Sequence, residues 1–222
     1  MSTANVVRID GRSLTIGDVV AVARGHARVE MTDAARAQMA ASNAIVSRIV
    51  ERNEVVYGVT TGFGKLSDIA IPPHRLAELQ VNLIRSHAVG VGPLLSEAEV
   101  RAMMLLRANV ISKGYSGARA VLVDLLAGML NAGLYPPVPE QGSVGASGDL
   151  APLAHLALSM IGEGSLFKGE QSGPAAEMLR ANGLEPVELG PKEGITLING
   201  TQAHTAIAAL LVHDTHRIWR AA

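Results

Sequence analysis

The chain has 222 residues, no cysteine, and 19 lysines and arginines against 20 aspartates and glutamates, for a formal net charge of −1. A chain of this length can bury a core, and its near-zero charge gives no electrostatic reason to expect nucleic-acid binding. The lack of cysteine excludes disulfides, thiolate metal sites and cysteine nucleophiles. No apolar run approaches the roughly 18 residues that cross a bilayer, and the N-terminus lacks a secretory pattern. We therefore expect a cytoplasmic protein with no metal site and no membrane segment.

The composition favours a mainly α fold. Aromatic residues make up only 3% of the chain, so the core must consist of aliphatic residues and the 8 methionines, which suit packed helices better than sheets. The first half of the chain is expected to form a strand at 6–9, helices at 15–23 and from 32 to about 50, a loop at 55–65, and helices at 72–88, 96–113 and 118–131. A glycine-rich loop at 141–149 and a helix to about 161 are expected next. A loop-rich stretch at 162–198, with a short helix near 175–182, then leads to a helix from 199 to the last residue.

The glycine-rich loop at 142–149, with the sequence GSVGASGD, does not match the common catalytic glycine loops. A nucleophile elbow requires G-x-S-x-G, but Ser147 is followed directly by Gly148, and Asp149 occupies the second glycine position. A dinucleotide-binding loop requires G-x-G-x-x-G after a strand, and a P-loop requires Gly-Lys-Ser/Thr. Neither pattern is present in this loop.

The tripeptide Ala146-Ser147-Gly148 can instead react with itself. A tight bend can bring the backbone nitrogen of Gly148 onto the carbonyl carbon of Ala146 and close a five-membered ring. Loss of water leaves an imidazolone, and dehydration of Ser147 adds an exocyclic methylidene group. Gly148 has no Cβ to obstruct the attack, and Ser147 supplies the leaving hydroxyl. The product is an electrophile at the start of a helix, where the backbone field favours developing negative charge.

This loop, extended to GSVGASGDLAPLAH, resembles the signature of the aromatic amino acid ammonia-lyases, which carry a 4-methylidene-imidazol-5-one (MIO) group. Four further blocks resemble family segments and occur in the family order, so the resemblance covers the chain from about residue 6 to its end. These blocks are VVYGVTTGFGKL at 55–66, LQVNLIRSHAVGVGP at 79–93, NVISKGYSG at 109–117 and LINGTQ at 197–202.

The resemblance implies the N-terminal domain of the ammonia-lyase fold, a mainly α, fumarase/aspartase-like helical fold. Residues 1–198 would form the MIO-bearing helical domain, and 199–222 would begin a central helical bundle that is cut short. Family members are more than twice this length and assemble as homotetramers whose sites combine three chains. A tyrosine, an arginine for the substrate carboxylate and a glutamate would lie beyond residue 222, so we expect this chain alone to be an incomplete and inactive fragment.

The resemblance also implies roles for individual residues. Ala146, Ser147 and Gly148 would form the MIO group, which substrate attacks through its amine or its ring, without any metal or external cofactor. Tyr57 would act in proton transfer near the amine, or could be an ordinary core aromatic. Asn199 would hydrogen-bond the MIO carbonyl or the substrate carboxylate, and it is also a typical helix N-cap. Three residues would support the loop bend and ring closure: Gly142, Gly145 and Asp149.

The residues Ser86-His87-Ala88 resemble the histidine ammonia-lyases within this family. An imidazole at His87 suits a substrate that itself carries an imidazole, although a histidine near a helix end can also simply bond backbone carbonyls. The GFGKL and GTQ motifs point the same way. We therefore expect deamination of L-histidine to trans-urocanate and ammonia, the first step of histidine degradation. The alternatives are a tyrosine or phenylalanine ammonia-lyase, an aminomutase, or a non-catalytic remnant that binds partners.

Three other histidines need no catalytic role. His213 and His216 are three residues apart on the last expected helix, but no third ligand is evident, so we predict a solvated face and no metal site. His155, within an apolar helix, is expected to be a buried side chain with a hydrogen bond.

Overall fold

The computed structural model describes residues 6–62, 64 and 69–222, and this part of the chain is mainly helical. The helices are α1 (Ile16–Ala23), α2 (Asp33–Glu51), the 3-10 helix η2 (Pro73–Arg75), α3 (Leu76–His87), α4 (Glu97–Ile111), α5 (Val121–Ala132), α6 (Leu150–Met160), α7 (Ala175–Ala181), α8 (Glu193–Ile198) and α9 (Gln202–Ala221). The strands are β1 (Val6–Ile9), β2 (Arg28–Met31), β3 (Val91–Leu94), β4 (Pro139–Gln141), β5 (Ser165–Lys168) and β6 (Gln171–Pro174).

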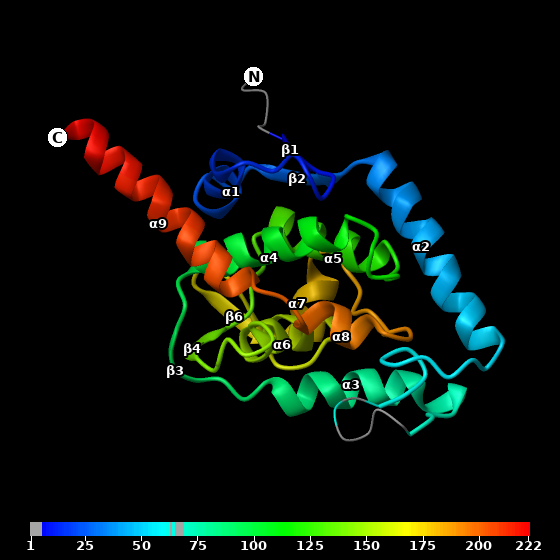
Figure 1. Cartoon of the computed structure of the whole chain (residues 1–222). Coiled ribbons are helices and arrows are strands. Elements are labelled where there is room, and N and C mark those ends of the chain that lie inside the picture. The colour runs from blue at the N-terminus through cyan, green and yellow to red at the C-terminus, as the bar shows by residue number, and fades with distance from the viewer. Residues whose placement is uncertain (1–5, 63, 65–68) are drawn as a thin grey trace.

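The helices form two packed groups (Figure 1). In the first, α4 packs against α1, α5 and α9, and the parallel strand pair β1–β2 contacts α5. In the second, α3, α6 and α8 pack against one another. The helix α9 passes from the middle of the molecule to one side, and its C-terminal end projects beyond the other elements (Figure 1).

The predicted helix starts follow from capping side chains. Thr15 accepts a hydrogen bond from the backbone nitrogen of Asp18, whose carboxylate bonds back to Thr15, and Ser96 with Glu99 forms the same capping box at α4. Thr32 caps α2 through the backbone nitrogen of Ala35. The predicted starts of these three helices are therefore confirmed. They could be predicted because each cap depends on residues within one helical turn.

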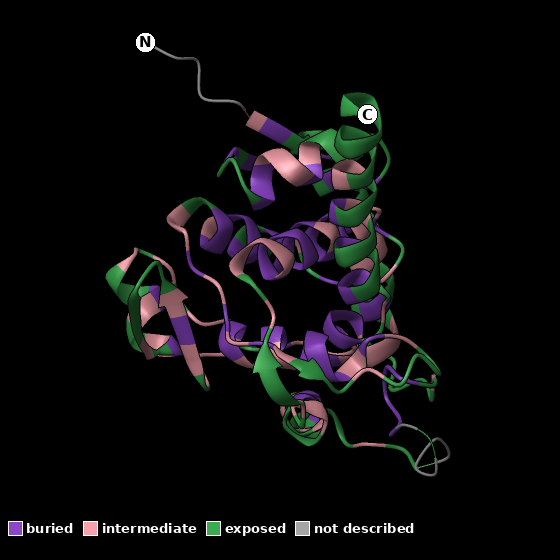
Figure 2. Cartoon of the chain, turned by 90° about the vertical axis from the view of Figure 1, so that its left-hand side faces the viewer, coloured by how far each residue is buried: buried purple, intermediate pink, exposed green. Residues whose placement is uncertain are grey.

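The core is built from aliphatic and methionine side chains, as the composition predicts. The helix α4 lies at its centre, and Met103, Met104 and Leu105 on that helix are fully buried. Figure 2 shows the buried residues concentrated where α4 and α5 meet the neighbouring helices, whereas the outer part of α9 is exposed. Small and flexible side chains allow these helices to approach closely without aromatic residues.

In the described part of the chain three short strand pairs accompany the helices, and of these strands only β1 was predicted. The strand β3 pairs antiparallel with β4, with Val91 opposite Gln141, and β5 pairs with β6 as a hairpin within the stretch expected to be loop-rich. The helix α8 lies in the same stretch and was also missed. Elements of three to six residues have too few positions to show a hydrophobic period, so their formation depends on tertiary packing.

The last helix begins later than predicted, and the expectation that Asn199 is its N-cap is wrong. Asn199 is the C-cap residue of α8 with extended backbone angles, and α9 begins at Gln202 with Thr201 as its N-cap. Residues 199–201 therefore form a turn between two helices, which we call the elbow. The sequence is apolar on both sides of the elbow, so its hydrophobic periodicity does not indicate that the helix is interrupted there.

The expectation that no apolar run is long enough to cross a bilayer is also wrong by length and composition. Glu193–Ala221 contains a window with mean hydropathy 1.3, and 44% of that window is buried inside the protein. The packing of α8 against α3 and α6, together with that of α9 against α4 and α1, accounts for this burial. The apolar residues of this segment thus contribute to the protein core.

A matched pair of glycines tests how tightly the helices pack. Gly117 and Gly133 both have φ of +72°, but a Cβ at Gly117 would overlap the side chain of Val46, whereas a Cβ at Gly133 would meet no atom of the described residues within 4 Å. We expect Gly133→Ala to lower the free energy of unfolding by about 1 kcal/mol through backbone strain. Gly117→Ala should cost about 1–3 kcal/mol more through overpacking. Urea denaturation measures the free energy of unfolding of both variants. Equal losses would contradict the packing of α2 against the turn at Gly117.

Candidate active site

The glycine-rich loop lies between β4 and α6, with its reactive tripeptide at the surface. Ala146 and Ser147 are exposed, and the adjacent Val144 is 87% exposed. The backbone takes left-handed φ values of +67° at Gly145 and +123° at Gly148. Both values favour glycine strongly over other residues, so the loop is bent on each side of Ala146-Ser147.

The end of this loop packs backbone to backbone on the elbow. A Cβ at Gly148 would lie 2.6 Å from the carbonyl oxygen of Gly200 and 2.9 Å from its nitrogen. The next residue, Asp149, donates its backbone N–H to the Gly200 carbonyl at 2.6 Å. Only glycine permits this approach, because a side chain at Gly148 would have to displace backbone rather than a movable side chain.

The Asp149 carboxylate fastens the loop to the start of α9. It is buried, accepts a hydrogen bond from the Ser143 hydroxyl at 2.8 Å, and accepts another from the backbone nitrogen of His204 at 3.0 Å. The His204 ring also forms an ion pair with this carboxylate when protonated. Since Thr201 makes no side-chain cap, Asp149 satisfies a free amide of the first turn of α9 from a distant part of the sequence.

The beginning of the loop is fixed by the segment that follows α3. A Cβ at Gly142 would lie 3.1 Å from Cα of Gly90 and 3.0 Å from Cβ of Ala151, so these backbones are in close contact. Gly90 in turn donates its N–H to Nε2 of His155 at 3.1 Å. His155 is therefore hydrogen-bonded as predicted, although it is half-buried, and burial lowers the pKa of its imidazole.

His87 is the last residue of α3, three residues before Gly90. Its Nδ1 lies 2.8 Å from the carbonyl oxygen of Leu83 and 3.1 Å from the hydroxyl oxygen of Ser86. A carbonyl can only accept, so Nδ1 carries a proton, and in the neutral ring Nε2 is left as an acceptor. The contact with a backbone carbonyl that is expected of a histidine near a helix end is therefore present.

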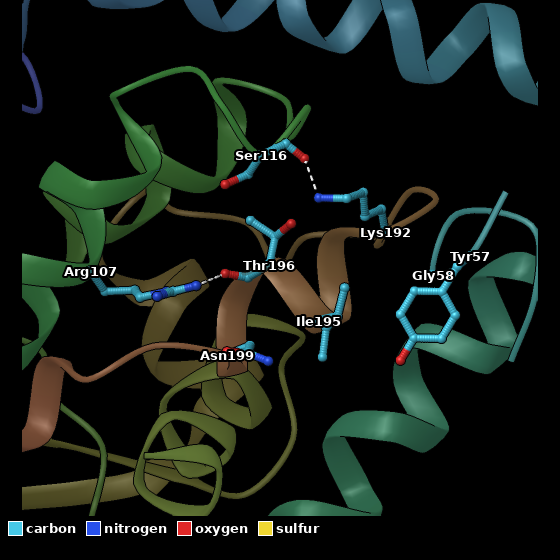
Figure 3. Close-up of a pocket in the computed structure, with 8 residues that line it drawn as sticks. All are labelled: Tyr57, Gly58, Arg107, Ser116, Lys192, Ile195, Thr196 and Asn199. Carbon is cyan, nitrogen blue, oxygen red and sulfur yellow. Dashed lines mark hydrogen bonds between the residues drawn. The ribbon is translucent and has the colours of Figure 1, made fainter. Parts of the chain in front are cut away.

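A pocket of about 300 Å³ lies between the loop at residues 55–62 and α8 (Figure 3). Tyr57 and Asn199 both line it, so the structure brings these two predicted site residues together, whereas His87 and the tripeptide are not part of its lining. Tyr57 is 63% exposed, and the interpretation of it as a core aromatic is therefore wrong. Figure 3 shows its ring on the side of the pocket opposite Arg107.

Two cationic residues of this pocket were not predicted. Lys192 has a left-handed φ of +68°, and its Nζ donates to the carbonyl oxygen of Ser116 at 2.8 Å, while burial lowers the pKa of the amine. Arg107 is buried, and burial lowers its pKa to about 10. An arginine within the apolar run of α4 is a signal that the sequence offers, because such a residue needs buried acceptors. Lys192 reaches the pocket only through tertiary packing.

The described residues of the GFGKL motif and the histidines of α9 are not part of this pocket. The GFGKL motif includes Phe63, Lys65 and Leu66, which fall outside the described residues. Among residues 6–62, 64 and 69–222, no group of three or more histidines and acidic residues is arranged to hold a metal ion. His213 and His216 line a pocket together with Ile16 and Gly17 of α1.

The fold and the Ala-Ser-Gly loop together define the class of this protein. The sequence profile of the family described as "Aromatic amino acid lyase" matches residues 14–222, so the chain belongs to this family. Its members are carbon-nitrogen lyases and their relatives, and the mainly helical fold agrees with the solved structures of the family.

Individual relatives give a narrower comparison. The chain is 50% identical over 210 residues to the histidine ammonia-lyase of Gloeobacter violaceus, covering 95% of this chain and 41% of the relative. The histidine ammonia-lyase structure from Trypanosoma cruzi has a TM-score of 0.89 and 43% identity over 96% of this chain and 41% of that one. A tyrosine aminomutase structure from Streptomyces globisporus has a TM-score of 0.87 and 41% identity over 93% of this chain and 39% of that one. The chain thus spans about two fifths of these relatives.

Substitutions at Asp149 test its role as a remote cap of α9. We expect Asp149→Ala to lower the free energy of unfolding by about 1–2 kcal/mol, because the His204 amide and the Ser143 hydroxyl lose their acceptor. Asp149→Asn should lose less, since asparagine is also a good capping acceptor. Thermal unfolding followed by circular dichroism gives both values. A fully stable alanine variant would contradict the capping role.

His155 should make the stability of the chain pH-dependent. Burial lowers its pKa in the folded state, so the unfolded chain binds the proton first as pH falls. The contribution of neutral His155 to the free energy of unfolding is therefore fully present above the pKa of the unfolded chain, about 6.5, and is lost as pH falls through the lower pKa of the folded chain. His155→Gln retains an acceptor for Gly90 but cannot titrate. Urea denaturation at about pH 8 and about pH 5 should show a smaller acid loss in this variant, and equal losses would disprove the assignment.

Proposed function

We propose that this chain carries the electrophile-forming segment of a histidine ammonia-lyase, which converts L-histidine to trans-urocanate and ammonia without oxidation. The main supporting observation is the bent Ala146-Ser147-Gly148 loop, whose end packs backbone to backbone on the elbow that carries Asn199. The 50% identity to the histidine ammonia-lyase of Gloeobacter violaceus supports the assignment of the substrate. Because the chain spans about two fifths of that relative, activity, substrate and partners of the whole protein are part of this proposal.

The residues of the loop fit an MIO group. Gly148 has no room for a Cβ, Gly145 and Gly148 supply the bend, and Ala146 and Ser147 are not held in the core. The ring closes when the Gly148 nitrogen attacks the Ala146 carbonyl carbon. The Ala146 oxygen leaves as water with the amide hydrogens of Ser147 and Gly148, and the Ser147 hydroxyl leaves as a second water with its Cα hydrogen. Neither step consumes an oxidant or an external cofactor.

When formed, this group supplies an electrophile that activates the bound amino acid. The other residues bind and orient that amino acid. Tyr57 would move a proton near the amine, and Asn199, exposed at the end of α8, would donate a hydrogen bond to a carboxylate or carbonyl oxygen. Both residues line the same pocket of about 300 Å³, a size suited to a small molecule. Gly142, Gly145 and Asp149 would hold the loop in the bent state.

His87 is the residue that we assign to recognition of the substrate side chain. With Nδ1 donating to the Leu83 carbonyl, Nε2 of the neutral ring is an acceptor for the N–H of a substrate imidazole. The segment from His87 to Gly90 leads directly to the contact with Gly142, so it lies close to the start of the loop. A phenylalanine side chain would leave this acceptor without a partner, which favours histidine.

A tyrosine or phenylalanine lyase or an aminomutase is the second candidate. The tyrosine aminomutase from Streptomyces globisporus is nearly as similar to this chain as the histidine ammonia-lyase from Trypanosoma cruzi, at 41% against 43% identity. A phenolic hydroxyl could also donate to Nε2 of His87, so side-chain recognition alone does not separate these substrates. Product analysis separates them, because a lyase releases ammonia and an unsaturated acid whereas an aminomutase retains the amine.

The proposal extends to assembly and location. We infer a cytoplasmic homotetramer for the whole protein, with 1–198 as the MIO-bearing domain and 199–222 as the start of the helical bundle, and no nucleic-acid, membrane or metal partner. Exposed apolar residues on α9, including Leu211, Ile218 and Trp219, would suit packing against further helices. We expect the 222-residue chain alone to have little or no activity, because the remaining substrate-binding residues are not in it.

Intact-mass spectrometry and a substrate assay test this function. We expect the chain to be lighter than its sequence mass by two waters, and Ser147→Ala to remove the methylidene precursor and that second water. The control Val144→Ala, at an exposed position in the same loop, should retain the loss of both waters. Incubation with L-histidine should give little urocanate from the chain alone. An unmodified mass for the native chain would disprove the electrophile, and robust turnover would disprove the inactivity.

A further inference from the structure

We propose that Arg107 is a positioning residue, which holds the elbow in the conformation against which the glycine-rich loop packs. This inference rests on the proposed function only in what it says about ring closure. Arg107 belongs to α4, far in sequence from the loop and from the elbow. It lines the pocket that contains Tyr57 and Asn199, but its hydrogen bonds among the described residues go to the two sides of the elbow.

The guanidinium of Arg107 joins the two sides of the elbow. Its Nη1 donates to Oε1 of Gln202, the first residue of α9, at 2.6 Å. Its Nη2 donates to the backbone carbonyl of Thr196, near the end of α8. These two bonds fix the end of one helix relative to the start of the next. The intervening turn contains Asn199 and Gly200, so a single planar side chain bonds to both flanks of this turn.

Gly200 lies between Arg107 on one side and the loop on the other. A Cβ at Gly200 would overlap Nη1 of Arg107, which shows that the guanidinium lies directly against this backbone. The carbonyl oxygen of Gly200 receives the Asp149 N–H at 2.6 Å and lies against Gly148. A displacement of Gly200 toward the guanidinium would therefore weaken the contact that holds the end of the loop.

The charge of Arg107 supports a structural requirement at this position. Among the described residues its hydrogen bonds go to neutral oxygens, its Nε has no hydrogen-bond partner, and burial lowers its pKa to about 10. A buried cation without a carboxylate partner is costly, so its presence indicates a geometric need that other side chains do not meet. A lysine could reach only one of the two acceptors well, because it lacks the planar fork.

The same helix provides a matched control in Arg101. This side chain is also fully buried and also donates to backbone carbonyls, those of Val22 and Leu130. Among the described residues its hydrogen-bond acceptors belong to α1 and α5, its ion-pair partner Glu97 lies on α4 itself, and none of these contacts reaches the elbow or the loop. Arg101→Lys therefore reproduces the general cost of altering a buried arginine of α4 without disturbing the proposed contact.

Amide hydrogen exchange in the 222-residue chain tests the proposal directly. We compare Arg107→Lys with Arg101→Lys and follow the backbone amides of Asp149 and His204, which donate to the elbow and to the Asp149 carboxylate. We expect Arg107→Lys to accelerate exchange at both amides by about tenfold or more relative to Arg101→Lys, at matched global stability. The milder variant Gln202→Ala removes one acceptor and should show a smaller increase at the same amides.

The outcomes are separable from those of the proposed function. Equal exchange at these two amides in the Arg107 and Arg101 variants would overturn the positioning role, whether or not the ring forms. If Arg107→Lys does not fold, Gln202→Ala provides the same comparison, and native exchange rates there would overturn it. When the native chain loses two waters, Arg107→Lys should slow that loss while Arg101→Lys does not. If the native chain has the unmodified mass of its sequence, the electrophile is disproved, but the positioning role of Arg107 is not.

Discussion

The close approach of the Gly148–Asp149 backbone to Gly200 is the contact on which the candidate site depends. It brings together a loop that follows β4 and a turn that separates α8 from α9, more than 50 residues later in the sequence. Glycine is required on the loop side because a Cβ at Gly148 would meet backbone atoms. The Asp149 carboxylate then caps α9, so the same short segment closes the loop and begins the helix. Loop geometry and helix geometry are therefore coupled.

The helix α4 provides the fixed frame for this contact. Its methionine and leucine residues form the centre of the core, while its two buried arginines reach backbone carbonyls on different sides of the molecule. The start of the loop is held separately, through the contact of Gly142 with Gly90 and the hydrogen bond from Gly90 to His155. The exposed tripeptide is thus supported at both ends by buried, hydrogen-bonded groups, which is how a strained or reactive backbone segment is maintained.

The sequence predicted the parts of this arrangement that depend on short-range patterns. The caps at Thr15, Thr32 and Ser96, the aliphatic core and the glycine-rich loop follow from residues within a turn or two of one another. The elbow and the remote cap could not be predicted, because asparagine is a typical N-cap residue and the acceptor that caps α9 is 55 residues from the amide that it binds. Apart from β1, the strands were missed because segments of three or four residues show no period.

A crystal structure of the 222-residue chain, resolved well enough to define the bonds of residues 145–149, is the most direct test of the central claim. Continuous density between the Gly148 nitrogen and the Ala146 carbonyl carbon, with Asp149 still bonded to the Gly200 carbonyl, is the predicted result. An open peptide at Ala146-Ser147-Gly148, with the elbow contact intact, would show that this bend does not suffice for ring closure and would contradict the account.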